Sequence, residues 1–345
     1  MSYINVIYSG FNVSIQDMGR PQKQHLGVPV SGALDPMALR LANSLVGNPQ
    51  ACEALEIQIL GPTLEVAAES VRVALAGTRA ELEILGQDPV RFPAHQSVTL
   101  TRGQRFRVGA LPDSSTAYLA VEGGFAVPRV YGSRSTYSRA GIGGLNGRVI
   151  QDGDSIPLEV PTVRSRGEIR LANDSYLDAT GPFRVILGPQ RDFFSDEAMA
   201  LFLSRDYAVT RDADRMGMRL DGPVLEHVRG YNIVSDGIVT GAVQVPGNGL
   251  PIILLADHQT TGGYPKLGAV ISADIPRLGR LRPGDALRFE EVSIEAAEAA
   301  IRDQEAGLRR QIDGMISAGA WLDEAALYRE NLISGIVRYG EGESD

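Results

Sequence analysis

Short apolar or alternating runs recur along most of the chain, and turn-forming residues separate them. Examples are RVALAG, QSVTLT, TAYLAVEG, PIILLA and ALRFEEV. Alternating and β-branched apolar residues favour strands, and 39 glycines and 19 prolines are available for the turns between them. The pattern predicts a mainly β protein whose strands form sandwiches or barrels.

Two segments in the body of the chain have the period of a helix instead. DPMALRLANSLVG begins at Asp35, which suits an N-cap, and ends at Gly47, which suits a C-cap. FSDEAMALFLSR predicts a second helix with Ser195 or Asp196 as its cap. We therefore expect each half of the chain to hold one helix ahead of its Gly-Pro segment, GPTLEV or GPVLEH.

The composition changes after Val292. The segment SIEAAEAAIRDQEAGLRRQIDGMISAG is rich in Ala, Glu and Arg, and Ser293 suits its N-cap. Helical spacing relates Leu308, Ile312, Met315 and Ile316. A further helix is predicted in LDEAALYRENLISGIV. Such a tail either packs on the preceding domain or docks another subunit, and the sequence favours neither.

A weak internal repeat divides the body in two. QILGPTLEV (58–66) resembles MRLDGPVLEH (218–227), and QDGDSIPLEV (151–160) resembles RPGDALRFEEV (282–292). Two matching pairs in the same order favour duplication over chance. We predict related β-rich domains at residues 1–165 and 166–292, divided within the polar stretch 161–182, and a helical extension at 293–345.

Composition and charge exclude several classes of function. The chain has 345 residues with a net charge of -9, which argues against nucleic acid or an anionic membrane as partner. A single cysteine, Cys52, excludes an internal disulfide framework and a thiolate zinc site. The N-terminus does not have the pattern of a signal peptide, and no apolar run reaches the length of a membrane span. We expect a cytoplasmic protein.

The segment LLADHQTTGGYPKLG (254–268) is the first candidate for chemistry. An apolar run leads directly into a carboxylate, an imidazole, an amide, hydroxyls, a phenol and an ammonium group, and a glycine pair permits a bend among them. We expect Asp257 to act as acid or base and Lys266 to bind an anion. Hydroxyl donors to an oxyanion would be Thr261 and Tyr264. The alternative is a hairpin with solvated polar residues.

Other polar stretches supply further candidates. The long loop 16–36 is rich in polar residues, loop 131–148 is rich in Arg and Gly, and GPQRDFFS precedes a helix, a place that favours anions. In TRDADRMGMRL a surface ion pair explains Asp214 and Arg215 equally well. No Walker, zinc-protease or G-x-S-x-G motif occurs, and the histidines are far apart, so we expect no metal site.

Four of these stretches resemble one known family. They are QDMGRPQKQHLGVPVSGALDPMALRLANSLVGN, GSRSTYSRAGIGGLNGR, DRMGMRLDGP and QVPGNGLPIILLADHQTTGGYPKLGAVISADIPRLGRLRPGD. The family is variously called allophanate hydrolase subunit 2, the C subunit of 5-oxoprolinase, and biotin-dependent carboxyltransferase. The likeness spans roughly residues 6–289 and leaves out the tail. It implies two tandem cyclophilin-like β-barrel domains with a ligand cleft lined by these loops.

The resemblance implies three alternative functions. The first is the C subunit of a bacterial ATP-dependent 5-oxoprolinase, which with the A and B subunits opens 5-oxoproline to glutamate. The second is the carboxyltransferase component of a biotin-dependent carboxylase acting on urea or a related amide. The third is a regulatory protein that antagonises a kinase inhibitor without catalysis. Because the chain holds no nucleotide motif, no ATP-grasp module and no biotin-attachment segment, we expect an enzyme subunit that is inactive alone, and we rank the first function highest.

The matched motifs also imply site residues for a small amide or lactam. ATP would be used by the complex, biotin would be needed only under the second function, and a homo-oligomer is an open alternative. The expected catalytic residues are Asp257, Lys266, Tyr264 and His25. The expected substrate-binding residues are Asp17, Arg20, Ser31, Arg134, Thr136, Gln190, Asp214, Arg215, Gln244, Gln259, Thr261, Gly262 and Gly263.

Overall fold

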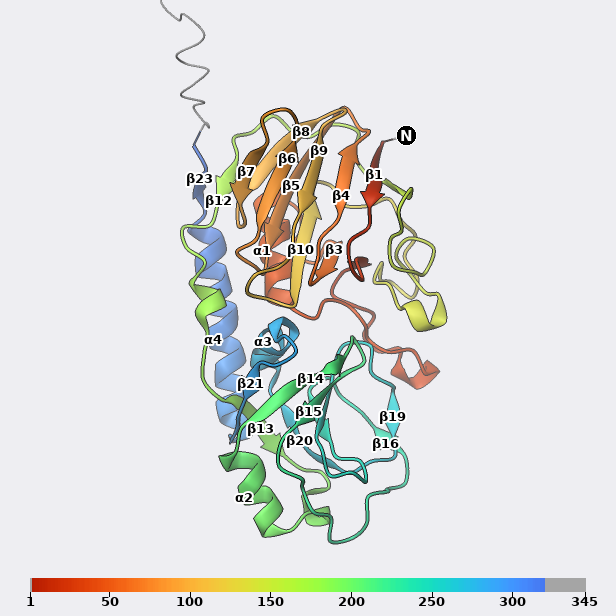
Figure 1. The fold of residues 1–345 in the computed structure, drawn as a ribbon, viewed down its shortest axis with the longest axis vertical. Helices are drawn as coiled ribbons and strands as arrows, with labels where there is room; N and C mark the ends of the chain where they lie inside the picture. Colours follow the sequence, from red (N-terminus) through yellow and green to blue (C-terminus); the bar gives the residue numbers. More distant parts are fainter. Residues whose placement is uncertain (1, 320–345) are drawn as a thin grey trace, which may run out of the picture.

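The computed structural model describes residues 2–319, which form two β-rich lobes along the long axis of the molecule (Figure 1). The N-terminal lobe has a six-stranded sheet of order β11-β1-β4-β9-β6-β7 and a five-stranded sheet of order β2-β3-β10-β5-β8. Its strands are β1 (Tyr3–Tyr8), β2 (Ser14–Gln16), β3 (Ala54–Gln58), β4 (Thr63–Val66), β5 (Ser70–Ala76), β6 (Glu81–Leu85), β7 (Val90–Pro93), β8 (Ser97–Thr101), β9 (Arg105–Val108), β10 (Thr116–Val121) and β11 (Ser155–Pro157).

The C-terminal lobe is built on an eight-stranded sheet of order β21-β14-β15-β18-β17-β20-β13-β22. A separate two-stranded ribbon, β16 (Asp236–Gly237) with β19 (Thr261–Gly262), lies beside it. The strands of the large sheet are β13 (Phe183–Leu187), β14 (Tyr207–Ala213), β15 (Gly217–Asp221), β17 (Ala242–Gln244), β18 (Ile252–Leu254), β20 (Lys266–Val270), β21 (Ala286–Leu287) and β22 (Phe289–Glu291). The expectation of a mainly β, barrel-like protein is therefore confirmed.

Each lobe buries its own apolar core. In the N-terminal lobe Ile4, Leu55, Val73 and Phe106 belong to one cluster that both sheets share. In the C-terminal lobe the buried side chains of the large sheet pack around Phe202 and Phe289, whose rings stack at 4.4 Å. The segments of the second predicted pair each add a strand to the sheet of their own lobe, but β11 pairs with β1 antiparallel whereas β22 pairs with β13 in parallel. The residues at which the domains divide stay a prediction.

The helices begin where their capping residues predict. Helix α1 (Pro36–Val46) is capped by the Asp35 carboxylate, which accepts a hydrogen bond from Ala38 N at 2.9 Å. Ser195 and Ser293 cap α2 (Asp196–Ser204) and α4 (Ile294–Asp313) in the same way. The sequence did not indicate the short α3 (Ile275–Arg280). Single 3-10 turns are η1 (Gln24–Leu26), η2 (Ser138–Ala140), η3 (Ser175–Asp178), η4 (Arg191–Phe193) and η5 (Ser272–Asp274).

The C-terminal extension differs from its prediction. Helix α4 ends at Asp313, so Met315 and Ile316 lie beyond it, and β23 (Ile316–Ser317) pairs with β12 (Ile169–Arg170) instead. Ser317 and its neighbours can pair because the helix has already ended at Gly314, its C-cap. The helix predicted in LDEAALYRENLISGIV lies outside the described residues.

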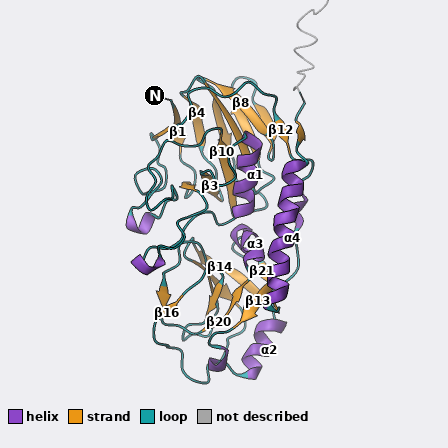
Figure 2. Ribbon diagram, turned by 180° about the vertical axis from the view of Figure 1, so that it is seen from behind, coloured by secondary structure: helices purple, strands orange, loops and turns teal. Residues whose placement is uncertain are grey.

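Helix α4 packs on both lobes and not on the second alone. Ala300 contributes to a small cluster with Ile271 and Ala273 of the C-terminal lobe. About two turns later, Leu308 is fully buried with the side chains of α1. Figure 2 shows α4 running past both α3 and α1. The helix therefore ties the lobes together along one side.

Within the described residues, no helix combines the length and apolarity that crossing a bilayer requires.

Replacing Leu308 with alanine tests this tie. The side chain is fully buried against α1, so Leu308→Ala should lower the free energy of unfolding by about 2–5 kcal/mol. Glu298→Ala on the same helix is the control, since its side chain is 64% exposed, and it should stay within about 0.5 kcal/mol. Chemical denaturation measures both, and equal effects would contradict the packing described here.

The stability of the protein should also depend on pH through His95. Burial lowers the pKa of this ring to about 4, and Nε2 lies 2.9 Å from the Tyr176 hydroxyl oxygen. A histidine in an unfolded chain has a pKa of about 6.5, so between these two pKa values the unfolded chain binds a proton that the folded chain does not. The free energy of unfolding should fall by up to about 3 kcal/mol as the pH drops through this window.

The comparison for this pH effect is His95→Gln, which has no ring to protonate. Its unfolding free energy, measured by denaturant titration from pH 7 to pH 4, should decline less than that of the unaltered chain. Parallel declines would show that His95 does not cause the effect.

Candidate functional site

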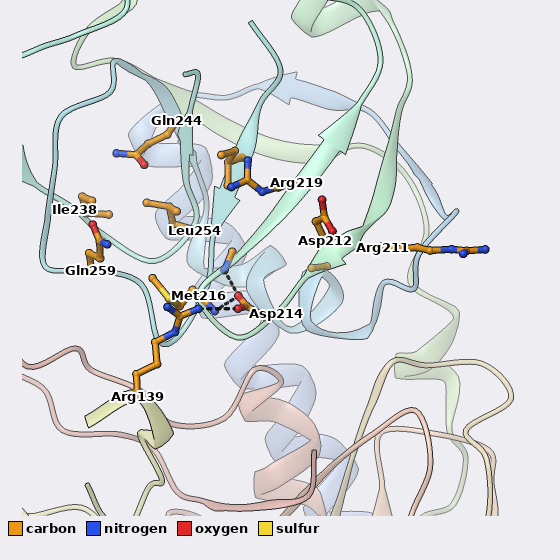
Figure 3. Close-up of a pocket in the computed structure, with 13 residues that line it drawn as sticks. Arg139, Arg211, Asp212, Asp214, Met216, Arg219, Ile238, Gln244, Leu254 and Gln259 are labelled. Carbon is orange, nitrogen blue, oxygen red and sulfur yellow. Dashed lines mark hydrogen bonds and ion pairs between the residues drawn. The ribbon is translucent and has the colours of Figure 1, made fainter. Parts of the chain in front are cut away.

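The candidate site is a pocket of about 600 Å³ on the face of the C-terminal sheet that turns away from the apolar core (Figure 3). Three strands, β15, β18 and β17, supply its floor. It is lined by Arg139, Arg211, Asp212, Ala213, Asp214, Met216, Gly217, Arg219, Ile238, Gln244, Ile252, Leu254 and Gln259. Polar groups of both charges and apolar side chains thus line the pocket together.

A single row of side chains crosses the floor of the pocket. Arg219 on β15 lies opposite Ile252 on β18, and Ile252 lies opposite Gln244 on β17. Directly paired residues project from the same face of a sheet. The alternation within each strand sends Met218 and Ile253 into the core instead. The row places a guanidinium group and a carboxamide on either side of one apolar side chain.

Both ends of this row carry unused hydrogen-bonding capacity. Arg219 is exposed and, within residues 2–319, forms no ion pair. Gln244 is only 6% exposed, and its buried Nε2 has no hydrogen-bond partner. In Figure 3, Gln244, Ile238 and Gln259 lie on one side of Leu254, and Arg219 lies on the other. The arrangement suits a small ligand with a negative group and an amide.

The N-terminal lobe reaches the rim of the pocket. Arg139, on the turn η2 of loop 131–148, forms an ion pair with Asp214 at 3.2 Å. Both side chains are more than half exposed, so the pair contributes little to stability. Asp214 also accepts a hydrogen bond from Met216 N at 2.7 Å, which shapes the turn into β15. Asp214 thus pairs with Arg139, whereas Arg215, considered with it for a surface ion pair, is held by Glu56 and Asp257.

The β16–β19 ribbon forms a corner beside the pocket. Lys266 is 4% exposed, and its Nζ lies 2.9 Å from Asp236 Oδ2. Gln190 Oε1 accepts a hydrogen bond from Lys266 N at 3.0 Å. The ion pair with Lys266 lowers the pKa of Asp236. Thr261 and Tyr264, with Gly262 and Gly263 between them, stand at the exposed end of this corner.

Behind the pocket, Arg215 joins the two lobes. Its Nε donates to Asp257 Oδ2 at 2.8 Å, its Nη1 pairs with Glu56 of β3, and its Nη2 donates to Gly32 O at 2.7 Å. Burial alone would lower the pKa of Arg215, but the two carboxylates outweigh it and raise the pKa. Both oxygens of Asp257 accept hydrogen bonds from Arg215. The expected role of Asp257 as acid or base stays a prediction.

A second buried network holds the N-terminal loops in place. The carboxylate of Asp17 accepts from Ser133 Oγ at 2.6 Å and from Arg134 N at 2.7 Å, which joins loop 16–36 to loop 131–148. Thr136 Oγ1 donates to Ile15 O at 2.9 Å. Arg20 is 1% exposed and donates to Ser135 O, while burial lowers its pKa.

The remaining expected residues are divided between this network and the surface. Arg134 is held in ion pairs with Glu53, at 2.7 Å, and Glu159. Ser31 is buried and its hydroxyl has no partner. His25 is exposed on η1 and takes part in none of these contacts. Of the expected residues, only Asp214, Gln244 and Gln259 line the pocket itself.

The most informative residue missed by the sequence analysis is Arg219. The alternation in MGMRLDG carried the signal, because Met218 and Leu220 face the core and therefore turn Arg219 to the opposite side. Within residues 2–319, no three His, Cys, Asp or Glu side chains are grouped as a metal site would require.

Replacing each of two aspartates near the pocket should lower the free energy of unfolding by very different amounts. Asp257→Ala leaves the buried Arg215 with one carboxylate fewer, and we expect a loss of about 3 kcal/mol in unfolding free energy. Asp214→Ala removes an exposed pair and a turn hydrogen bond, and should cost about 1 kcal/mol or less. Thermal and denaturant unfolding measure both. A loss for Asp257→Ala no larger than that for Asp214→Ala would contradict the bridging role of Arg215.

Comparisons with known proteins agree on one family. The family model described as carboxyltransferase domain, subdomain A and B, matches residues 26–291. The chain is 34% identical to the C subunit of 5-oxoprolinase from Escherichia coli (strain K12) over 302 residues, which are 88% of this chain and 95% of that protein. It is 31% identical to urea amidolyase of Saccharomyces cerevisiae over 330 residues, covering 90% of this chain and 18% of that protein.

Solved structures give the same result. The crystal structure of the K. lactis urea amidolyase matches 91% of this chain and 21% of that one, with a TM-score of 0.81 and 28% identity. The chain thus resembles nearly the whole of one relative and a limited part of two much longer ones. Since the family model covers well over half of its length, the chain belongs to the family of the carboxyltransferase domain, subdomain A and B.

Proposed function

We propose that this chain is the C subunit of a bacterial, ATP-dependent 5-oxoprolinase. It would work with the A and B subunits to open 5-oxoproline to glutamate, and ATP would be used elsewhere in the complex. The likeness to the Escherichia coli protein, which extends over 95% of that protein, supports this assignment. Homologues named as subunits or parts of enzymes support a role in an enzyme complex.

The observation that carries the proposal is that Arg219 and the carboxamide of Gln244 line the same pocket. 5-Oxoproline has a carboxylate, which is ionised at neutral pH, and a lactam. An unpaired guanidinium group binds a carboxylate in two parallel hydrogen bonds. Arg219 would hold the carboxylate, and the amide side of the pocket would receive the ring. Urea is neutral and gives Arg219 no comparable partner.

The other residues of this chain would position the substrate. The Arg215 bridge fixes the pocket rim against the N-terminal lobe through its neighbours Asp214 and Met216. Lys266, held by Asp236, closes the corner next to Gln244. Opening the lactam breaks its C–N bond and adds the elements of water, the hydroxyl to the carbonyl carbon and the proton to the nitrogen. The residues that we expect to take part in that step are Asp257, Tyr264 and His25.

Arg219→Ala tests the proposal in the complex assembled with the A and B subunits. Loss of a charge-assisted hydrogen bond costs about 1.5–3 kcal/mol, so kcat/KM for ATP-dependent loss of 5-oxoproline should fall by about 10- to 150-fold. Arg302→Ala, on the exposed side of α4 and 67% exposed, should leave the rate unchanged. The proposal is wrong if the unaltered complex does not consume 5-oxoproline when given ATP.

Carboxyl transfer is the alternative that the fold supports, through the match to the K. lactis urea amidolyase. Under that function the chain would accept a carboxyl group from a biotinylated carrier, for transfer to urea or a related amide. Partners identified after affinity capture from the native cells separate the two. A biotin carrier with a biotin carboxylase would favour carboxyl transfer. A purely regulatory protein would keep its partner binding when the pocket residues are replaced.

A further inference from the structure

The carboxamide of Gln244 is the least explained polar group in the pocket. Its Nε2 is buried without a partner, and no described residue hydrogen-bonds to its Oε1. The nearest parts of the pocket offer none, since Ile238, Ile252 and Leu254 are apolar. A buried N–H donor that lacks a partner loses free energy relative to water. An amide in this position is therefore a feature that a ligand would use.

The fold holds this carboxamide in one place. Residue 244 is paired on both sides, with Ile252 of β18 and with Lys266 of β20. Beside it, Gly262 leaves the space that the side chain occupies, because a Cβ on Gly262 would lie 2.6 Å from Gln244 Nε2 and 2.7 Å from Ile238 Cδ1. The amide therefore fills a gap that exists because residue 262 has no side chain.

The chemistry of a carboxamide defines what it recognises. Its carbonyl oxygen and one N–H lie on the same edge, so it pairs in two hydrogen bonds with a group that also has N–H and C=O side by side. A lactam, a primary amide and urea all present such a cis amide edge. A trans peptide bond, an ester and a carboxylate do not.

We propose that Gln244 reads the cis amide edge of the substrate and so determines the substrate class of this site. Gln244 Nε2 donates to the substrate carbonyl oxygen, and Oε1 accepts from the substrate N–H. This inference rests on the proposed function for the site itself. Arg219 lies two strands away, about 10 Å between Cα atoms, and its long side chain takes a carboxylate on the same molecule.

The names of two relatives fit this proposed role. The relatives are named for 5-oxoprolinase and for urea amidolyase, and 5-oxoproline and urea share the cis amide edge. Only 5-oxoproline has a carboxylate in addition. Gln244 therefore selects the amide class, and Arg219 selects the acid within it.

Titration calorimetry of the assembled complex with 5-oxoproline tests the inference. Gln244→Met keeps the size of the side chain and removes both hydrogen bonds, so the affinity should fall at least about tenfold. N-methyl-5-oxoproline, which lacks the N–H, should bind the unaltered complex at least about tenfold more weakly than 5-oxoproline. In Gln244→Met the affinities for N-methyl-5-oxoproline and 5-oxoproline should differ much less, because the side chain that accepts from the substrate N–H is already gone.

A matched pair of glycine variants gives a second test that spares Gln244 itself. Gly262→Ala pushes a methyl group against the ends of two flexible side chains, so the fold should tolerate it while the amide is displaced and 5-oxoproline affinity falls at least about fivefold. Gly237 lies on the paired strand of the same ribbon, and a Cβ there meets open space. Gly237→Ala should therefore change neither the stability of the fold nor the affinity for 5-oxoproline. Thermal unfolding of each variant confirms that it is folded.

The outcomes separate this inference from the proposed function. Turnover of 5-oxoproline with unchanged affinity in Gln244→Met would overturn the inference and leave the function standing. Binding of urea that depends on Gln244, in a complex that does not consume 5-oxoproline, would support the inference and reject the function. If the unaltered complex binds neither 5-oxoproline nor urea, the inference is overturned.

Discussion

The relative position of the two lobes depends on the cation of Arg215. Moving a guanidinium group out of water costs several kcal/mol unless hydrogen-bonded carboxylates surround it, and here those carboxylates come from different lobes. Asp257 belongs to the C-terminal lobe, whereas Glu56 lies on β3 of the N-terminal lobe and also accepts from the Tyr118 hydroxyl at 2.6 Å. The arrangement of the lobes seen here satisfies all of these groups together.

The pocket derives its shape from this bridge. Asp214 and Met216, the neighbours of Arg215 in sequence, line the pocket, and so does Gln259, two residues beyond Asp257. A shift of the lobes would therefore move the rim on which Arg139 meets Asp214. The floor, by contrast, is set by strand register within one lobe. A rigid floor with a rim shared between lobes is an arrangement that can hold a small ligand in a fixed orientation.

The local structure could be predicted from the sequence, but much less of the candidate site could. Caps such as Asp35 and Ser293 accept a hydrogen bond from a backbone N–H only three residues later, so the helix starts could be predicted. Alternating apolar and polar residues likewise indicate a half-buried strand. Which strands pair is a long-range property. The row of Arg219, Ile252 and Gln244 joins strands that are not all consecutive in sequence, and nothing local shows it.

The same limit explains the polar loops and the tail. The variety of side chains in loops 16–36 and 131–148 indicated a ligand site, and in the structure Asp17 joins the two loops while Thr136 bonds to the backbone of β2. Polar residues that pin loops and polar residues that bind ligands have the same composition. For α4, the apolar stripe predicted a helix that packs, but it could not say that two lobes share that stripe.

The pairing of β12 with β23 has a consequence for synthesis on the ribosome. The N-terminal lobe can close once β11 has emerged to pair with β1, and the C-terminal lobe once β22 has emerged to pair with β13. Helix α4 and β23 leave the ribosome after both, and β23 returns to a strand made much earlier in the chain, as the pairing of Ile169 with Ser317 shows. Domains generally fold as units in the order of their synthesis. The segment that ties the lobes together along one side is therefore added to two lobes that already have all their own strands.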